Sequence, residues 1–156
     1  MTDWEPRVAR VWALLDVLPE AEFRARVADL DLPPAVAAFE RAAAFDSTGR
    51  SDLAVPLYRE ALALGVPGER RRRAVVQLAS SLRNLGEVAE SVALLTAELA
   101  EPSDHLDDAV RAFLALALVD AGREREAASL ALAALAPHLP RYQRSLAHYA
   151  RALVES

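Results

Sequence analysis

A glycine-centred pattern occurs three times in the chain, around Gly49, Gly86 and Gly122. The glycines stand 37 and 36 residues apart, and the same residue types recur at fixed offsets from each of them. An alanine stands seven residues before each glycine, a large apolar residue four before, a small residue five after, and leucines eight and thirteen after. The set is Ala42, Phe45, Ala54, Leu57 and Leu62, then Ala79, Leu82, Ser91, Leu94 and Leu99, then Ala115, Leu118, Ala127, Leu130 and Leu135. Such an internal repeat restricts the chain to a few architectures.

The offsets are those of two helices joined at the glycine. Residues three or four apart lie on one helical face, so the positions before the glycine share a face and those after it form a second stripe. Glycine accepts the positive φ that ends a helix, and small residues let the two backbones approach. Only 6% of residues are aromatic in a chain that is 53% hydrophobic, and alanine and leucine favour helix. We therefore expect antiparallel helical hairpins that must stack to bury their apolar faces.

The pattern weakens towards both ends of the chain. Residues 2–34 read as a degenerate hairpin in which Asp16 replaces the glycine. Trp4 and Trp12 there are interpreted as core packing, with exposed anchors for a partner as the alternative. A helix over 141–154 reads as a cap. Its predicted apolar stripe towards the stack is Tyr142, Leu146, Tyr149 and Leu153, and its predicted solvent side is Arg144, His148 and Arg151.

The sequence Gly49…Ala54…Tyr58…Ala61, with a proline such as Pro67 after the second helix, resembles the tetratricopeptide repeat, a helix–turn–helix unit of about 34 residues. The resemblance extends from about residue 35 to 140. It implies an all-α, right-handed superhelix (solenoid) of antiparallel hairpins with about nine helices. The expected repeats are 35–68, 72–105 and 108–141, within one domain of residues 1–156. All 18 basic residues are arginine, a usage typical of GC-rich bacterial genomes, so we expect a bacterial member.

No catalytic or metal-binding motif stands out in the chain. His105, His138 and His148 are not paired at the spacing of helix-borne metal ligands, and there is no cysteine. No nucleophile elbow or phosphate-binding glycine motif is present. A net charge of −5 argues against a nucleic-acid binder. The first residues lack a signal-peptide pattern, and the longest apolar run, 112–119, is too short to span a bilayer. We expect no catalytic residue, metal or cofactor, no membrane association, and a cytoplasmic protein.

The resemblance also implies where a partner binds. In the family, the first helix of each hairpin lines a concave groove, and ligand contacts recur at fixed positions before the glycine. The candidate groove residues are Phe39, Asp46, Arg73, Val76, Ser80, Arg83, Asn84, Leu116 and Asp120. Arg83 and Asn84 could bind a peptide backbone or carboxylate. The alternative for Arg83 is an ion pair with Asp46 or Asp120 between neighbouring hairpins.

The arginine run 70–73 is the most unusual charge feature, because acidic residues are favoured where a helix begins. It is interpreted as a solvated face, or as a docking point for an acidic segment or phosphate. The function expected from all these features is a non-catalytic protein–protein interaction module, an adaptor or scaffold that binds a peptide or partner helix in its groove. The alternatives are a module that self-associates as a homodimer and an enzyme, although no residue of the sequence points to catalysis.

Overall fold

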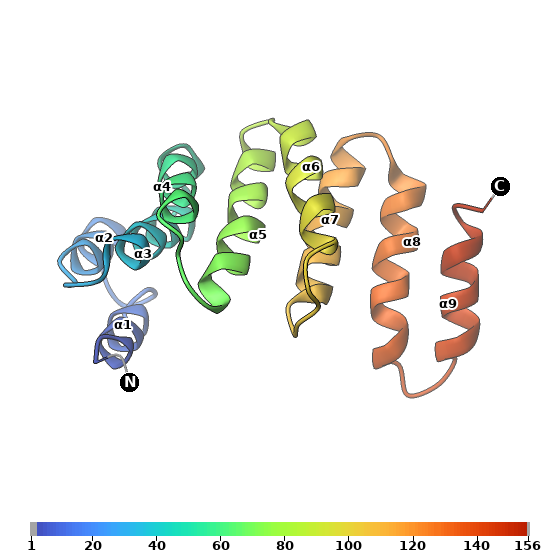
Figure 1. Ribbon diagram of the computed structural model, residues 1–156, viewed down its shortest axis with the longest axis horizontal. Coiled ribbons are helices and arrows are strands. Elements are labelled where there is room, and N and C mark those ends of the chain that lie inside the picture. The colour runs from blue at the N-terminus through green and yellow to red at the C-terminus, as the bar shows by residue number, and fades with distance from the viewer. Residues whose placement is uncertain (1–2, 156) are drawn as a thin grey trace. The chain divides into compact units, whose positions relative to one another are not determined.

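A computed structural model describes residues 3–155, and every regular element in that range is a helix (Figure 1). The helices are α1 Glu5–Trp12, α2 Glu20–Ala28, α3 Pro34–Asp46, α4 Ser51–Ala63, α5 Glu69–Asn84, α6 Val88–Leu99, α7 Asp107–Asp120, α8 Glu124–Leu135 and α9 Gln143–Ala152, with a 3₁₀ turn η1 at Ala136–His138. Helices α1 to α4 pack consecutively as neighbours, and so do helices α6 to α9. The prediction of an all-α fold of stacked hairpins is therefore confirmed.

The three glycines of the sequence pattern make the same turn. Gly49, Gly86 and Gly122 have φ values of +77°, +86° and +75°, and a side chain at such angles would be strained. In each turn the residue after the glycine donates its backbone N–H to the carbonyl four residues before the glycine, at 2.9 Å. This is the six-to-one hydrogen bond of a Schellman motif, which satisfies a carbonyl at the helix end. The sequence repeat thus corresponds to a repeat of backbone hydrogen bonds.

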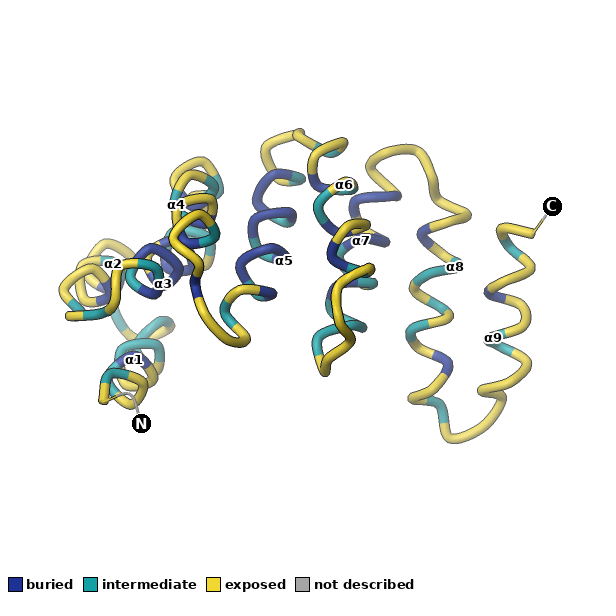
Figure 2. Tube along the Cα trace, in the orientation of Figure 1, coloured by how far each residue is buried: buried dark blue, intermediate teal, exposed yellow. Residues whose placement is uncertain are grey.

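Contacts divide the chain into two compact units, Met1–Ser81 and Leu82–Ser156, with α5 carrying the boundary. In the first unit α3 has seven buried residues among its thirteen (Figure 2). Tyr58 of α4 is 0% exposed, and its hydroxyl donates to Asp46 Oδ2 at 3.2 Å. Ser81 of α5 donates to the other oxygen of Asp46, also at 3.2 Å. Helix α5 therefore covers the groove between α3 and α4.

Helices α1 and α2 add a smaller cluster to the first unit. Phe23 and Val27 of α2 are buried there with Ala44 of α3. Trp12 packs edge-on against Phe23, with ring centroids 5.2 Å apart. The indole N–H of Trp12 donates to Glu40 Oε2 at 2.7 Å, so this ring serves packing and hydrogen bonding together. The Trp4 ring lies 4.9 Å from the Arg70 guanidinium.

In the second unit, α7 packs against both α6 and α8, and α9 packs against α8 (Figure 1). Within the described residues α9 makes no backbone contact with α7, so it extends the row of helices. Ser129 donates to the Ala150 carbonyl at 2.6 Å, and Arg125 donates to the Leu153 carbonyl at 2.8 Å, which holds α9 to α8.

The predicted apolar stripe of α9 is wrong in part. Leu146, Ala150 and Leu153 face the packed side, but Tyr142 is 75% exposed and Tyr149 is 66% exposed. The reason is that α9 packs on one neighbour, and a single helix covers too narrow a face for both tyrosines. Among residues 3–155, no helix is both long enough and apolar enough to cross a membrane.

Candidate interaction surfaces

The first unit contains five of the predicted groove residues, and two of them lie in the core. Phe39 is 0% exposed and Val76 is buried, so both pack against protein. The Arg73 guanidinium lies over the Phe39 ring, 5.0 Å from its centroid. Arg73 and Ser80 remain partly exposed. The phenylalanine thus supplies a platform that positions a cation at the surface.

Asp46 is half-buried and its two oxygens are already used, one by Tyr58 and one by Ser81. Burial raises the pKa of Asp46 above the usual aspartate value, and the two hydrogen bonds only partly oppose this. Asp46 therefore joins α3, α4 and α5.

The four arginines of the run 70–73 differ in their exposure and in their partners. Arg70 donates through Nε to Glu40 Oε1 at 2.7 Å, and through its two terminal nitrogens to Glu5 at 2.6 and 3.0 Å. The Arg70 guanidinium holds the pKa of Glu5 below its usual range. Arg72 is buried. Arg73, in contrast, has no ion-pair partner among residues 3–155, and its partly exposed guanidinium stacks on the Phe39 ring.

Arg73 lies at the edge of a hollow of about 260 Å³ between α1, α3 and α5. The lining residues are Val8, Trp12, Glu40, Ala43, Ser47, Arg70, Arg73 and Gln77. The side-chain carbonyl of Gln77 is buried without a hydrogen-bond partner in this part of the chain. The hollow is therefore lined by two guanidinium groups, by the carboxylate of Glu40 that pairs with one of them, by an amide and by apolar carbons.

The second unit contains the remaining four predicted groove residues. Arg83 Nε lies 2.6 Å from Asp120 Oδ2, although the N–H does not point at the oxygen, so the contact is an ion pair without a hydrogen bond. The two side chains are 27% and 37% exposed. Asn84 and Leu116 are exposed. The structure thus brings Arg83 and Asp120 together, as the structural alternative for Arg83 anticipated.

The most apolar surface described is a groove between α7 and α8, which we call the α7–α8 groove. Its volume is about 500 Å³. It is lined by Ala112, Ala115, Leu116 and Val119 of α7 and by Glu124, Ala127, Ala128 and Ala131 of α8. Leu116 is 45% exposed and Val119 is 48% exposed. Both are large apolar side chains that the unit leaves in contact with solvent.

The internal repeat shows why the α7–α8 groove is open. Tyr58 and Ala131 stand at the same offset, nine residues after their glycines. In the first hairpin Tyr58 is fully buried and α5 covers the groove, whereas Ala131 is exposed and α9 packs on another side of α8. Sequence reasoning missed this surface. The sequence signal for this open surface is Ala131, because the repeat pattern places a bulky residue at that position.

Titratable groups do not gather into a reaction centre in the described part of the chain. Among residues 3–155 no three histidine, aspartate or glutamate side chains lie close enough to hold a metal ion. His138 lies 2.8 Å from Asp108, and this contact, with Arg111, holds the pKa of Asp108 below its usual range. The pair joins the start of α7 to η1, which is a structural role.

Comparison with protein families matches residues 35–153 to the model described as the tetratrico peptide repeat. The match includes all three glycine turns and α9. No curated protein and no solved structure gives a significant match to the chain.

Proposed function

The chain belongs to the tetratricopeptide repeat family, and from this we propose that it is a non-catalytic adaptor or scaffold that binds a peptide or partner helix. Repeats of this family generally mediate protein–protein interaction, and the family is generally non-catalytic. The proposal concerns which surface of this chain does the binding and what kind of segment it takes.

The observation that carries the proposal is the open α7–α8 groove. Its small residues, Ala112, Ala128 and Ala131, would let another backbone approach closely, and Leu116 and Val119 would pack against its side chains. The corresponding groove of the first hairpin receives a helix of this same chain, α5. A helix with small and apolar residues on one face is therefore the segment that the α7–α8 groove fits best.

The predicted groove residues take different parts in this proposal. In the second unit Leu116 and Asn84 are exposed, and we propose that they contact the partner. In the first unit Arg73 and Ser80 are partly exposed, and we propose them as contacts made by that unit. Arg73 would pair with an acidic residue, because its guanidinium has no ion-pair partner in the described chain. For the other five residues we propose a supporting role, because Phe39 and Val76 are buried, Asp46 joins three helices, and Arg83 and Asp120 form a partly exposed ion pair.

Affinity capture from the native cell, with Leu116→Asp as the test variant, decides the proposal. A charge in the middle of an apolar groove should abolish retention of a specific partner. Val17→Asp is the matched control, because Val17 is also an exposed aliphatic residue but lies in the first unit. Capture of the same protein by the wild type and by Leu116→Asp, at equal levels, would refute the assignment of this groove.

A second candidate, self-association, is favoured by the same apolar groove. Two copies related by a two-fold axis could each cover the other's α7–α8 groove. Light scattering separates the two candidates. A monomer at high micromolar concentration leaves the groove for another protein, whereas a dimer that Leu116→Asp converts to a monomer would assign the groove to a second copy.

A further inference from the structure

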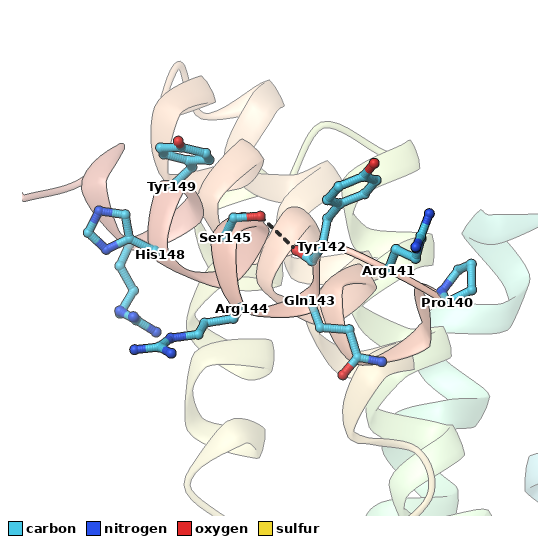
Figure 3. A pocket seen from close by; sticks show the side chains of 9 residues that line it. Pro140, Arg141, Tyr142, Gln143, Arg144, Ser145, His148 and Tyr149 are labelled. Carbon is cyan, nitrogen blue, oxygen red and sulfur yellow. Dashed lines mark hydrogen bonds between the residues drawn. The ribbon is translucent and has the colours of Figure 1, made fainter.

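The outward face of α9 has a chemistry unlike the rest of this acidic protein. Figure 3 shows the side chains of this face, which we call the basic–aromatic face. It comprises Arg141, Tyr142, Arg144, His148, Tyr149 and Arg151. The chain has a net charge of −5, yet no aspartate or glutamate occurs between Glu126 and Glu155. The stretch 127–154 is thus positively charged, and Glu155, one turn after Arg151, is the first carboxylate that follows it.

The arginines of this face are available to a ligand. Arg141, Arg144 and Arg151 are exposed, and none has an ion-pair partner among residues 3–155. Elsewhere in the chain arginines such as Arg50 and Arg123 are paired with a carboxylate. These three arginines therefore do not stabilise the fold through ion pairs.

The tyrosines lie beside the cations and are also unused by the fold. Tyr142, at the N-cap of α9, and Tyr149, within α9, point their rings to the same side of the helix (Figure 3). Arg144, His148 and Arg151 follow one another at helical spacing on the adjacent side, and the His148 and Tyr149 rings are 5.6 Å apart. The face therefore presents a cationic stripe next to an aromatic stripe. Exposed tyrosine and arginine are the residue types enriched where interfaces gain most of their binding energy.

The backbone supports the outward position of Tyr142. Its φ is +69°, the only positive φ of a non-glycine residue in the described chain. A tyrosine is strained there, and the helix start would accept a glycine or asparagine more readily. The strained residue is thus one whose ring contributes to the basic–aromatic face and is 75% exposed.

We propose that the basic–aromatic face binds an acidic, amphipathic segment of a protein partner. Carboxylates of that segment pair with Arg144 and Arg151, and its apolar side chains pack on Tyr142 and Tyr149. This deepens the proposed function and rests on it, because it names a second contact surface and the charge of the partner.

The surroundings of the face favour a protein partner over other anions. A membrane surface would require apolar side chains to insert, but Leu146, Ala150 and Leu153 of α9 face α8. Nucleic acid would require a broad basic surface, and three arginines on a protein of net charge −5 provide few phosphate contacts. An acidic helix about two turns long matches the spacing of the arginines.

The test uses the protein of residues 1–156 and two fluorescent peptides of equal negative charge. One is decaglutamate, and the other places leucines beside the glutamates at helical spacing. We expect the amphipathic peptide to bind more tightly than decaglutamate in low salt. The double variant Arg144→Glu/Arg151→Glu should weaken that binding by about tenfold, since two attractive contacts become repulsive. Circular dichroism verifies that the variant keeps its helical content.

The matched control is Arg10→Glu/Arg41→Glu, which reverses two exposed arginines of the first unit. Binding of the amphipathic peptide within about twofold of wild type is expected for this control. Equal loss in both double variants would overturn the proposal, because it would reveal a nonspecific effect of net charge. Preferred binding to phosphatidylserine vesicles or single-stranded DNA over both peptides would overturn it as well.

The variant Leu116→Asp separates this proposal from the α7–α8 groove. If it loses the captured partner but binds the amphipathic peptide as the wild type does, the two surfaces act independently. If the Arg144 and Arg151 reversal leaves peptide binding unchanged while Leu116→Asp still loses the partner, the basic–aromatic face is refuted and the proposed function stands.

Discussion

Arg70 and Glu40 form a largely buried ion pair, with Nε of the arginine 2.7 Å from Oε1 of the glutamate. Glu40 is 2% exposed and also accepts the indole N–H of Trp12. Removing the arginine would leave a buried carboxylate with a single neutral donor. We expect Arg70→Met to lower the free energy of unfolding by about 3 kcal/mol. Urea denaturation followed by tryptophan fluorescence measures this, because Trp4 and Trp12, the only tryptophans, lie in this unit.

The control for this pair is Arg41→Met, an exposed arginine on α3, the helix that carries Glu40. It should change the free energy of unfolding by less than about 0.5 kcal/mol. If Arg70→Met is as stable as the control, the Arg70–Glu40 contact contributes nothing and the network that ties α1 to α5 is not needed for folding.

Asp46 gives the first unit a specific pH dependence. Burial raises the pKa of Asp46 in the folded protein, so the folded state binds its proton more tightly than the unfolded chain does. The stability that this proton contributes is present below the ordinary aspartate pKa and is lost as the pH rises through the raised value. Relative to Asp46→Asn, the wild type should therefore become less stable between about pH 4 and about pH 7.

Unfolding free energies of the two proteins over that pH range measure the difference. Asp52→Asn is a suitable comparison because the Asp52 pKa is lowered by Arg50, so its contribution changes in the opposite direction with pH. A wild-type stability that rises relative to Asp46→Asn across the same range would show that the hydrogen bonds from Tyr58 and Ser81 outweigh the burial of the carboxyl.

The helical hairpins could be predicted from the sequence because their causes are local. The hydrogen bonds at Gly49, Gly86 and Gly122 depend on a positive φ and on residues within one turn, and the sequence pattern reports both. The partial burial of Arg70 could not be predicted, because its partner Glu5 lies 65 residues away and nothing in the run itself identifies it.

The open α7–α8 groove could not be predicted from the sequence pattern either. An amphipathic stripe shows that α9 packs on one side, but it does not say which neighbour receives it. Leu146 and Leu153 of α9 pack on the α8 side, so the α7–α8 groove stays open and both tyrosines stay exposed. The repeat register places Leu116 among the candidate groove residues, but the exposure of Leu116 depends on which helix α9 packs against.

Arg83 and Asp120 are close, but their partial exposure limits what the pair contributes. A double-mutant cycle with Arg83→Ala and Asp120→Ala should give a coupling energy of about 0.5 kcal/mol that decreases in high salt. Thermal denaturation followed by circular dichroism measures the four proteins. A coupling energy of zero would leave Arg83 without a structural role and would favour the alternative that it contacts the partner.

Tyr142 provides a test in which stability and binding move in opposite directions. Its left-handed backbone is strained for a tyrosine but not for a glycine, so Tyr142→Gly should leave the free energy of unfolding unchanged or raise it by up to about 1 kcal/mol. Tyr149→Gly, inside α9, should instead lower it by about 0.5 kcal/mol, because glycine is unfavourable in a helix interior. Both variants should weaken binding of the acidic amphipathic peptide. If Tyr142→Gly destabilises the protein as much as Tyr149→Gly does, the ring of Tyr142 supports the fold, and its strained backbone gives no support to a binding role for the basic–aromatic face.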